Sequence, residues 1–271
     1  MTRVKTQCNN PLNGLCKKLL SIAATSALLA TAANADIIRV EGAVGVWQSE
    51  PTGTIKYAGT PSFDIVDNAG FNASTNMYAW VYLKHPLPIL PNLRLEYADP
   101  KFSDTTKLDL SYGDYDFSAG ASNELTLTQY DAVLYYNILD NTFWTTIDLG
   151  LDVKFIDGNY NISGQAGGVD ETVDEDFDMV VPMAYLRGRV QLPVTNIGIE
   201  AVVRGMAYSS NNLVDAEVKI DYTMDFVPVI QPGLEIGYRY QQIKLDGDSI
   251  GIDADIDTTF SGIYGGLMVR F

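Results

Sequence analysis

The chain has 271 residues, with 34 acidic against 18 basic side chains and a formal net charge of −16 at pH 7. Such an acidic surface repels nucleic acid, and no basic patch in the sequence offsets it. With one histidine and two cysteines, the usual nitrogen and sulfur ligand sets for zinc or iron are absent, so we predict no cofactor and no metal centre.

The first 35 residues have the three parts of a secretory signal peptide. Residues 1–18 carry four lysines and arginines and no acid, and an apolar stretch follows over 19–33. The pattern Ala33-Asn34-Ala35 then predicts cleavage before Asp36. A transmembrane anchor is the alternative, but the stretch is shorter than the ~20 strongly apolar residues that a helical span needs. Residues 36–271 are therefore expected to be the mature domain.

Most of the mature chain alternates apolar and polar residues with a period of two, which is typical of strands with one dry and one wet face. In the clearest segment, 214–226, apolar side chains from Val214 to Phe226 alternate with polar ones from Asp215 to Asp225. The same reading predicts ten strands, although eight or twelve fit the pattern nearly as well. The predicted strands are 36–48, 76–85, 93–104, 122–137, 143–156, 178–192, 197–208, 214–226, 233–245 and 256–271.

The connections between these strands alternate in length. Those near 86–92, 138–142, 193–196 and 227–232 are short, whereas 49–75, 105–121 and 157–177 are expected to be long polar loops, with an extension of the first hairpin through 52–57 and 61–66 as the alternative within 49–75. Short turns on the side of the termini and longer loops on the other are typical of outer-membrane proteins. We therefore predict an all-β fold, a closed antiparallel up-and-down transmembrane β-barrel in the bacterial outer membrane.

The polar phase of the strands carries many charges, which a barrel would collect in its lumen, whereas a soluble sandwich would expose them. Inside a low-dielectric barrel such charges persist only when they are paired. The predicted lumen charges are Arg39, Glu41, Arg94, Glu96, Asp148, Asp152, Lys154, Arg187, Arg189, Glu200, Arg204, Lys219, Asp221, Glu235 and Arg239.

The last strand ends on an aromatic residue with apolar residues at alternate positions before it. Leu267, Val269 and Phe271 share one face of this strand and resemble the sorting signal that the outer-membrane assembly machinery reads. Together with the leader and the alternating strands, this ending favours a membrane barrel over a periplasmic sandwich. The expected partners are that machinery, outer-membrane lipid and lipopolysaccharide, and small solutes.

The chain resembles a family of small outer-membrane barrels named for a Gly-Gly pair near the C-terminus, common in Campylobacter-like and Helicobacter-like bacteria. The matching segments are 85–97 (HPLPILPNLRLEY), 129–137 (QYDAVLYYN) and the closing Tyr264-Gly265-Gly266. The resemblance implies the fold and the outer-membrane location. For the glycine pair itself we expect a structural role, since glycine in a barrel strand often marks a close approach of a neighbour.

Three candidate sites can be weighed from the residues alone. His85 falls beside a proline-rich turn, away from any serine that it could activate, so we predict no enzymatic activity. The acidic loops at 157–177 and 246–255 have oxygen ligands suited to divalent cations, but their spacing matches neither an EF-hand nor a glycine-rich calcium repeat, and solvated loops are the simpler interpretation. We predict a structural or passive-transport barrel with a narrow charged lumen. A surface-interaction barrel without a pore is the alternative, and a membrane-embedded hydrolase comes third.

Overall fold

The computed structural model describes residues 38–57, 59–87, 89–224, 230–247 and 254–271. The predicted leader and its cleavage site lie outside these residues. Within the described part of the chain, no helix is long and apolar enough to cross a membrane.

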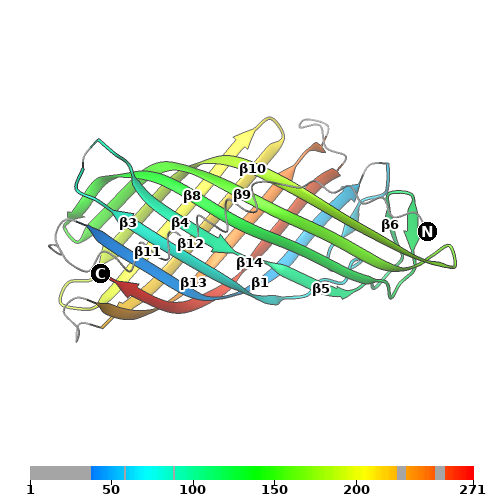
Figure 1. The fold of residues 1–271 in the computed structure, drawn as a ribbon, viewed down its shortest axis with the longest axis horizontal. Coiled ribbons are helices and arrows are strands. Elements are labelled where there is room, and N and C mark those ends of the chain that lie inside the picture. The colour runs from blue at the N-terminus through cyan, green and yellow to red at the C-terminus, as the bar shows by residue number, and fades with distance from the viewer. Residues whose placement is uncertain (1–37, 58, 88, 225–229, 248–253) are drawn as a thin grey trace.

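Ten antiparallel strand positions close into a barrel, which confirms the predicted fold class (Figure 1). Each strand pairs with its neighbour in the chain, and β1 pairs with β14 to close the ring. Wall strands in ring order are β1 (Arg39–Tyr57), β3 (Ser74–Lys84), β4 (Asn92–Ala98) with β5 (Lys101–Thr105), β8 (Ser122–Thr142), β9 (Thr145–Ala166), β10 (Val169–Gln191), β11 (Ile197–Tyr208), β12 (Asn211–Thr223), β13 (Gln231–Leu245) and β14 (Ala254–Arg270).

One wall position is divided between β4 and β5. Both segments pair with β8, and only Asp99 and Pro100 separate them. Because proline has no N–H to donate to the ladder, the strand is interrupted at this point, although the carbonyl of Pro100 still accepts a hydrogen bond from the backbone N–H of Leu127.

The start of β1 lies beside the end of β14, because the two strands are antiparallel and Glu41 of β1 pairs with Arg270 of β14. We call the half of the barrel nearest these residues the terminal half, and the other half the far half. The far half is extended by the β9–β10 hairpin, the end of β1, and the short strands β2 (Phe63–Asp64), β6 (Leu110–Tyr112) and β7 (Tyr115–Phe117).

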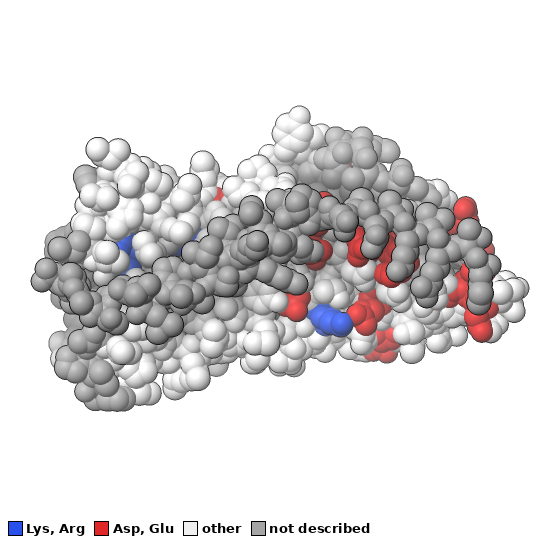
Figure 2. Space-filling model, viewed as in Figure 1, with Lys and Arg blue, Asp and Glu red and all other residues white. Residues whose placement is uncertain are grey.

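The outward side chains are apolar in the terminal half and polar in the far half. On β9 and β10 the apolar outward run ends at Phe155 and Val180, which are register partners. Tyr130 pairs with Phe155, and Tyr97 pairs with Tyr130, so the boundary continues along neighbouring strands. Outward residues beyond it include Asp157, Asn159, Asp176 and Asp178. On the face drawn in Figure 2, acidic groups gather over the half away from the C-terminus.

The inward side chains change in the opposite sense. They are mainly charged in the terminal half and apolar in the far half, where Phe102 stacks on Phe260 with 5.4 Å between ring centroids. Other buried members of this far-half core are Ile65, Phe71, Phe117, Leu125, Tyr160, Ile162, Leu213, Ile243 and Leu245. The barrel therefore has an apolar core in one half and a polar interior in the other.

The segment that follows β2 folds into the mouth of the far half. Ile65, Ala69 and Phe71 are buried, and the side-chain amide of Asn123 on β8 donates to the carbonyl of Ala69 at 3.0 Å. Gly70 has φ +91°, and a Cβ there would lie 2.1 Å from the carbonyl oxygen of Thr105. Residues 63–71 thus add apolar side chains to the far-half core.

Three predicted loops contain more strand than expected. Residues 157–177 were predicted as a long loop, but they continue β9 and β10 to a turn at Gly167 and Gly168. Likewise, β1 runs through residue 57, and residues 105–121 contain β6 and β7. The alternation looked broken near Phe155 because the outward side chains become polar there and the inward side chains become apolar. The loop prediction was wrong because it assumed that apolar side chains point outward on both sides of that boundary.

Candidate functional site

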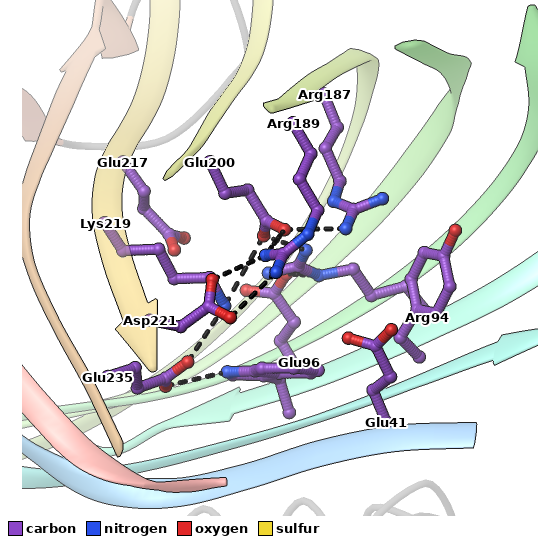
Figure 3. A network of polar contacts seen from close by, with 12 residues as sticks. Glu41, Arg94, Glu96, Arg187, Arg189, Glu200, Glu217, Lys219, Asp221 and Glu235 are labelled. Atoms are coloured by element: carbon purple, nitrogen blue, oxygen red, sulfur yellow. Dashed lines mark hydrogen bonds and ion pairs between the residues drawn. The ribbon is translucent and has the colours of Figure 1, made fainter. Parts of the chain in front are cut away.

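The charged interior of the terminal half is the most elaborate constellation of polar groups in the described chain, and it is built by alternate residues of nearly every wall strand. Figure 3 shows carboxylates and cationic groups from different walls pointing toward one another. Because strand side chains alternate between the two faces, each residue is placed inward by its register alone.

Glu200 of β11 is the first centre of this network. Its carboxylate lies 2.6 Å from Nη2 of Arg187 and 3.2 Å from Nη1 of Arg94. Arg189 and Lys219 approach it at 3.4 and 3.5 Å. Four cations thus surround one buried carboxylate. Their excess positive charge requires other acids nearby.

Arg204, also on β11, is the second centre and is surrounded by acids. It pairs with Glu96 of β4 and, at 2.8 Å, with Glu217 of β12. Asp152 and Asp215 each lie 3.6 Å from its guanidinium group. Glu96 also pairs with Arg94, so the two centres form one continuous network.

A third cluster of ion pairs forms around Asp215, which also contacts Arg204. Arg239 binds Asp215 through two nitrogens at 3.0 and 2.6 Å. Lys154 lies 2.7 Å from Asp131 and 3.2 Å from Asp215. A fully buried lysine is retained only with such partners, because the desolvation of its charge costs several kcal/mol, of order 5.

Aromatic rings fill the spaces between these ions. The Trp80 ring lies 4.1 Å from Nζ of Lys219 and 5.2 Å from the guanidinium carbon of Arg94. Its indole N–H donates to Glu235 at 3.0 Å, and the Tyr78 hydroxyl donates to the same oxygen at 2.7 Å. These rings both exclude water and satisfy the carboxylate.

The Gly265-Gly266 pair leaves room for one of these rings. A Cβ on Gly266 would lie 2.5 Å from the Tyr78 hydroxyl oxygen and 2.5 Å from the carbonyl oxygen of Val44. Glycine therefore allows the Tyr78 ring to lie against the barrel wall and reach Glu235. This is the structural role expected for the pair.

Several contacts join strands that are far apart around the ring. The amide side chains of Gln129 on β8 and Gln241 on β13 bond each other at 2.8 and 2.9 Å. Arg204 of β11 reaches Glu96 of β4, and Trp80 of β3 reaches Glu235 of β13. A cavity of about 10 Å³ beside Trp47 and Tyr264 holds at most one water molecule. The lumen is thus bridged from wall to wall at successive levels.

Of the fifteen predicted lumen charges, the structure buries all but Arg39. Arg39 stands at the rim with its side chain 42% exposed and pairs with Glu41. Glu41 also receives Arg270, and Arg189 forms a two-point pair with Asp221 at 2.6 and 2.7 Å. The network brings together thirteen of the fifteen within the lumen proper, with the Arg39–Glu41 pair at its terminal edge.

The sequence analysis missed Asp131 and the aromatic members of the interior. Asp131 lies in the segment QYDAVLYYN, where its inward phase follows from the alternation with Tyr130 and Ala132. The inward rings of Trp47, Trp80 and Tyr185 gave no such signal, because a large aromatic residue fits a lipid-facing position equally well.

The other predicted residues have simple positions. His85 lies in the β3–β4 turn, where Nε2 is 3.0 Å from the carbonyl oxygen of Pro91 and Nδ1 accepts from the N–H of Leu87. Leu267 of the predicted assembly signal is outward and 65% exposed, and Phe271 exchanges backbone hydrogen bonds with Val40. Among the described residues, no group of three or more His, Cys, Asp or Glu side chains is arranged to hold a metal ion.

Comparison with known proteins gives the fold but no family. No family model and no curated protein sequence matches the chain. The structure is similar to that of the outer membrane protease OmpT from Escherichia coli, with a TM-score of 0.51 and 9% identity over 86% of this chain and 97% of that one. The translocator domain of the autotransporter NalP from Neisseria meningitidis follows with a TM-score of 0.42, 12% identity and 95% of both chains covered.

The first of these comparisons corrects the prediction that the chain is not an enzyme. That prediction was drawn from the position of the single histidine, and the comparison overturns it because the same barrel fold carries a protease. A barrel of this size can therefore support catalysis. At 9% identity the likeness shows the outer-membrane barrel fold and transfers no activity to this chain.

Proposed function

We propose that the protein is a structural barrel of the bacterial outer membrane whose interior is closed along its length. The wall-to-wall contacts of the terminal half carry this proposal, because Arg204–Glu96, Trp80–Glu235 and Gln129–Gln241 each join distant strands across the lumen. The inserted segment 63–71 supports it from the far half. A passive-transport role would need a continuous water path past both.

The membrane placement is part of the same proposal. The apolar outward band of the terminal half, with Val44, Ile220 and Ile236 at least half exposed, suits lipid contact, and the polar far half would then project outside the cell. With ten strands, both termini lie on the periplasmic side. The C-terminal Leu267, Val269 and Phe271 would serve the assembly machinery, and membership of the Gly-Gly barrel family fits the same arrangement.

Conductance separates a closed barrel from a pore. Wild-type protein refolded into planar bilayers should give no current steps above background. A barrel with an established open pore, refolded and reconstituted in the same way, is the positive control and should conduct. Steps from the wild-type barrel would refute the closed interior. Sequencing the N-terminus of protein from the outer-membrane fraction tests the placement, and a start at Asp36 is expected.

A surface-interaction role is the second candidate, and the outward face of the β9–β10 extension favours it. Asp174 and Asp176 there accept hydrogen bonds from the Asn159 amide, both at 2.8 Å. Changing Asp174 and Asp176 to asparagine removes both carboxylates and leaves the β9–β10 pairing in place. The variant barrel should still migrate in a heat-modifiable way and should lose calcium-dependent adhesion to lipopolysaccharide vesicles. Undiminished adhesion would exclude this surface.

A further inference from the structure

An open groove of about 350 Å³ lies where β1, β13 and β14 run side by side in the far half. Its lining combines two lysines, three aspartates and three hydroxyl side chains. The groove is separate from the charged interior, which these strands line from their other face. Its principal members are Thr54, Lys56, Ser210, Lys244, Asp255 and Asp257.

Register places these side chains on the outer wall. Lys56 pairs with Asp255, Thr54 pairs with Asp257, and Lys244 pairs with Asp257 from the other side. The alternate residue Leu245 is buried inside the barrel, so Lys244 must point outward. The charged side chains of the groove therefore face the material that surrounds the barrel, whereas Leu245 and Ile256 form its inner edge at the far rim.

The charges in the groove are already matched to one another. Lys56 Nζ lies 3.3 Å from Asp255, and Lys244 Nζ lies 2.9 Å from Asp257. Each ammonium group has three donors and each carboxylate several acceptor positions, so most of this capacity remains for a ligand. The third aspartate gives the lining a net negative charge, which disfavours a phosphate group.

Mixed donors and acceptors with little net positive charge suit sugar hydroxyls, because each hydroxyl both donates and accepts. The position indicates where such sugars come from. Lys244 lies on the polar outer wall of the far half, four residues beyond the outward Tyr240, which is about 13 Å along a strand that is tilted in a barrel. On a membrane barrel, the outer wall of that half lies beyond the lipid and among the sugars of the surrounding lipid.

We propose that this groove binds the saccharide chain of a lipopolysaccharide molecule packed against the barrel wall. The inference rests on the outer-membrane placement proposed above and adds the partner, the chemical group and the residues. Lys244 would donate to sugar oxygens, Asp257 would accept from hydroxyls, and Thr54 and Ser210 would complete the hydrogen bonding from either side.

The test compares two ion pairs on the outer wall. Lys244→Ala with Asp257→Ala removes the groove pair, whose side chains are 54% and 45% exposed. Lys101→Ala with Glu124→Ala removes a pair outside the groove, 2.7 Å apart and with side chains 53% and 41% exposed. Full-length mature barrels in detergent micelles are titrated with lipopolysaccharide that carries a complete core oligosaccharide, or with lipid A, which lacks it.

The wild type should bind the core-bearing lipid more tightly than lipid A. The groove variant should lose about thirtyfold in affinity for the core-bearing lipid only, since two hydrogen-bonding side chains at about 1 kcal/mol each are removed, while the control variant should match the wild type. Equal binding of both lipids, or an equal loss in both variants, would overturn the proposal. The proposal would also be overturned if free core oligosaccharide bound tightly and lipopolysaccharide did not displace it.

Failure of the placement itself would look different. Heat-modifiable migration and recovery in the outer-membrane fraction report on the barrel and its location, and neither depends on the groove. If both hold while the lipid preference is absent, only the groove assignment is wrong.

Discussion

In the terminal half of the barrel the strands point charges inward and apolar side chains outward, whereas in the far half the same strands do the reverse. The change falls near Phe155 on β9 and Val180 on β10. In the terminal half, neighbouring opposite charges hold the interior together, so each ion depends on several others. In the far half, packing holds it together, and each side chain contributes mainly through the area it buries.

This difference shows that the two ends of one strand can be adapted to different surroundings. A wall that faces lipid must be apolar outside, and its narrow interior then receives the polar phase. On the proposed membrane placement, the outer wall beyond the lipid faces water, so the apolar phase turns inward and builds an ordinary core. The two different halves then follow from strands that are longer than the membrane is thick.

The largest expected effect comes from Arg204→Ala, which breaks the interior of the terminal half. Glu96, Glu217 and Asp215 would remain buried near one another without their shared cation. Removing one partner of a buried pair costs about 3–5 kcal/mol, and the free energy of unfolding in vesicles should fall by that amount. Urea titration of heat-modifiable migration measures it.

Lys101→Ala is the matched control for this change. Its pair with Glu124 is exposed on the outer wall, so the loss should stay below about 1 kcal/mol. If Arg204→Ala cost no more than this control, the claim that ion pairs hold the terminal half would be wrong.

Phe260→Ala tests the far half and should have the next largest effect. The ring is 1% exposed and stacks on Phe102, so its removal leaves a cavity in the apolar core. The expected cost is about 3 kcal/mol, accompanied by faster proteolysis within 63–71. Leu108→Ala, at a position 54% exposed, is the control and should change neither quantity. An unaltered protease pattern would contradict the role of this core in holding the inserted segment.

Tyr112→Phe should have the smallest effect and acts at the far rim. The Tyr112 hydroxyl donates to Glu175 at 3.1 Å, and its ring stacks on Tyr57. Loss of this hydrogen bond should cost about 1 kcal/mol. The variant keeps the ring, so any larger loss would show that the rim is coupled to the core below.

The same tyrosine predicts a dependence on pH. Burial, and then the neighbouring Glu175 carboxylate, raise the pKa of Tyr112 above its usual value. The folded rim therefore keeps the phenol proton more tightly than the unfolded chain does. Its contribution is fully present below about pH 10 and declines as the pH rises further. Wild type and Tyr112→Phe should converge in stability over that range, and parallel curves would argue against the hydrogen bond.

The positions of the wall strands could be predicted because apolar and polar residues alternate wherever one face of the wall is apolar throughout. The predicted segment 197–208 coincides with β11, the segments 122–137 and 233–245 lie within β8 and β13, and each of the others overlaps one wall position with different ends. The β9–β10 extension was missed because its outward residues, such as Asp157 and Asn159, read as a loop when lipid is assumed outside. Because lipid was assumed outside along the whole strand, Ile156 and Ile162 were not predicted as core residues.

Within the charged interior, the sequence determined which charges share a face, since parity along a strand fixes their direction. It could not determine that Arg204 would meet Glu96, because their strands lie four positions apart around the ring. Nor could it show that Gly266 makes room for Tyr78, or that Lys56 and Lys244 share a groove. Those contacts depend on barrel closure and on the stagger of the strands, which are properties of the whole ring. By itself the sequence therefore determined the strands, their faces and the barrel, whereas only the tertiary structure decided that the lumen is bridged.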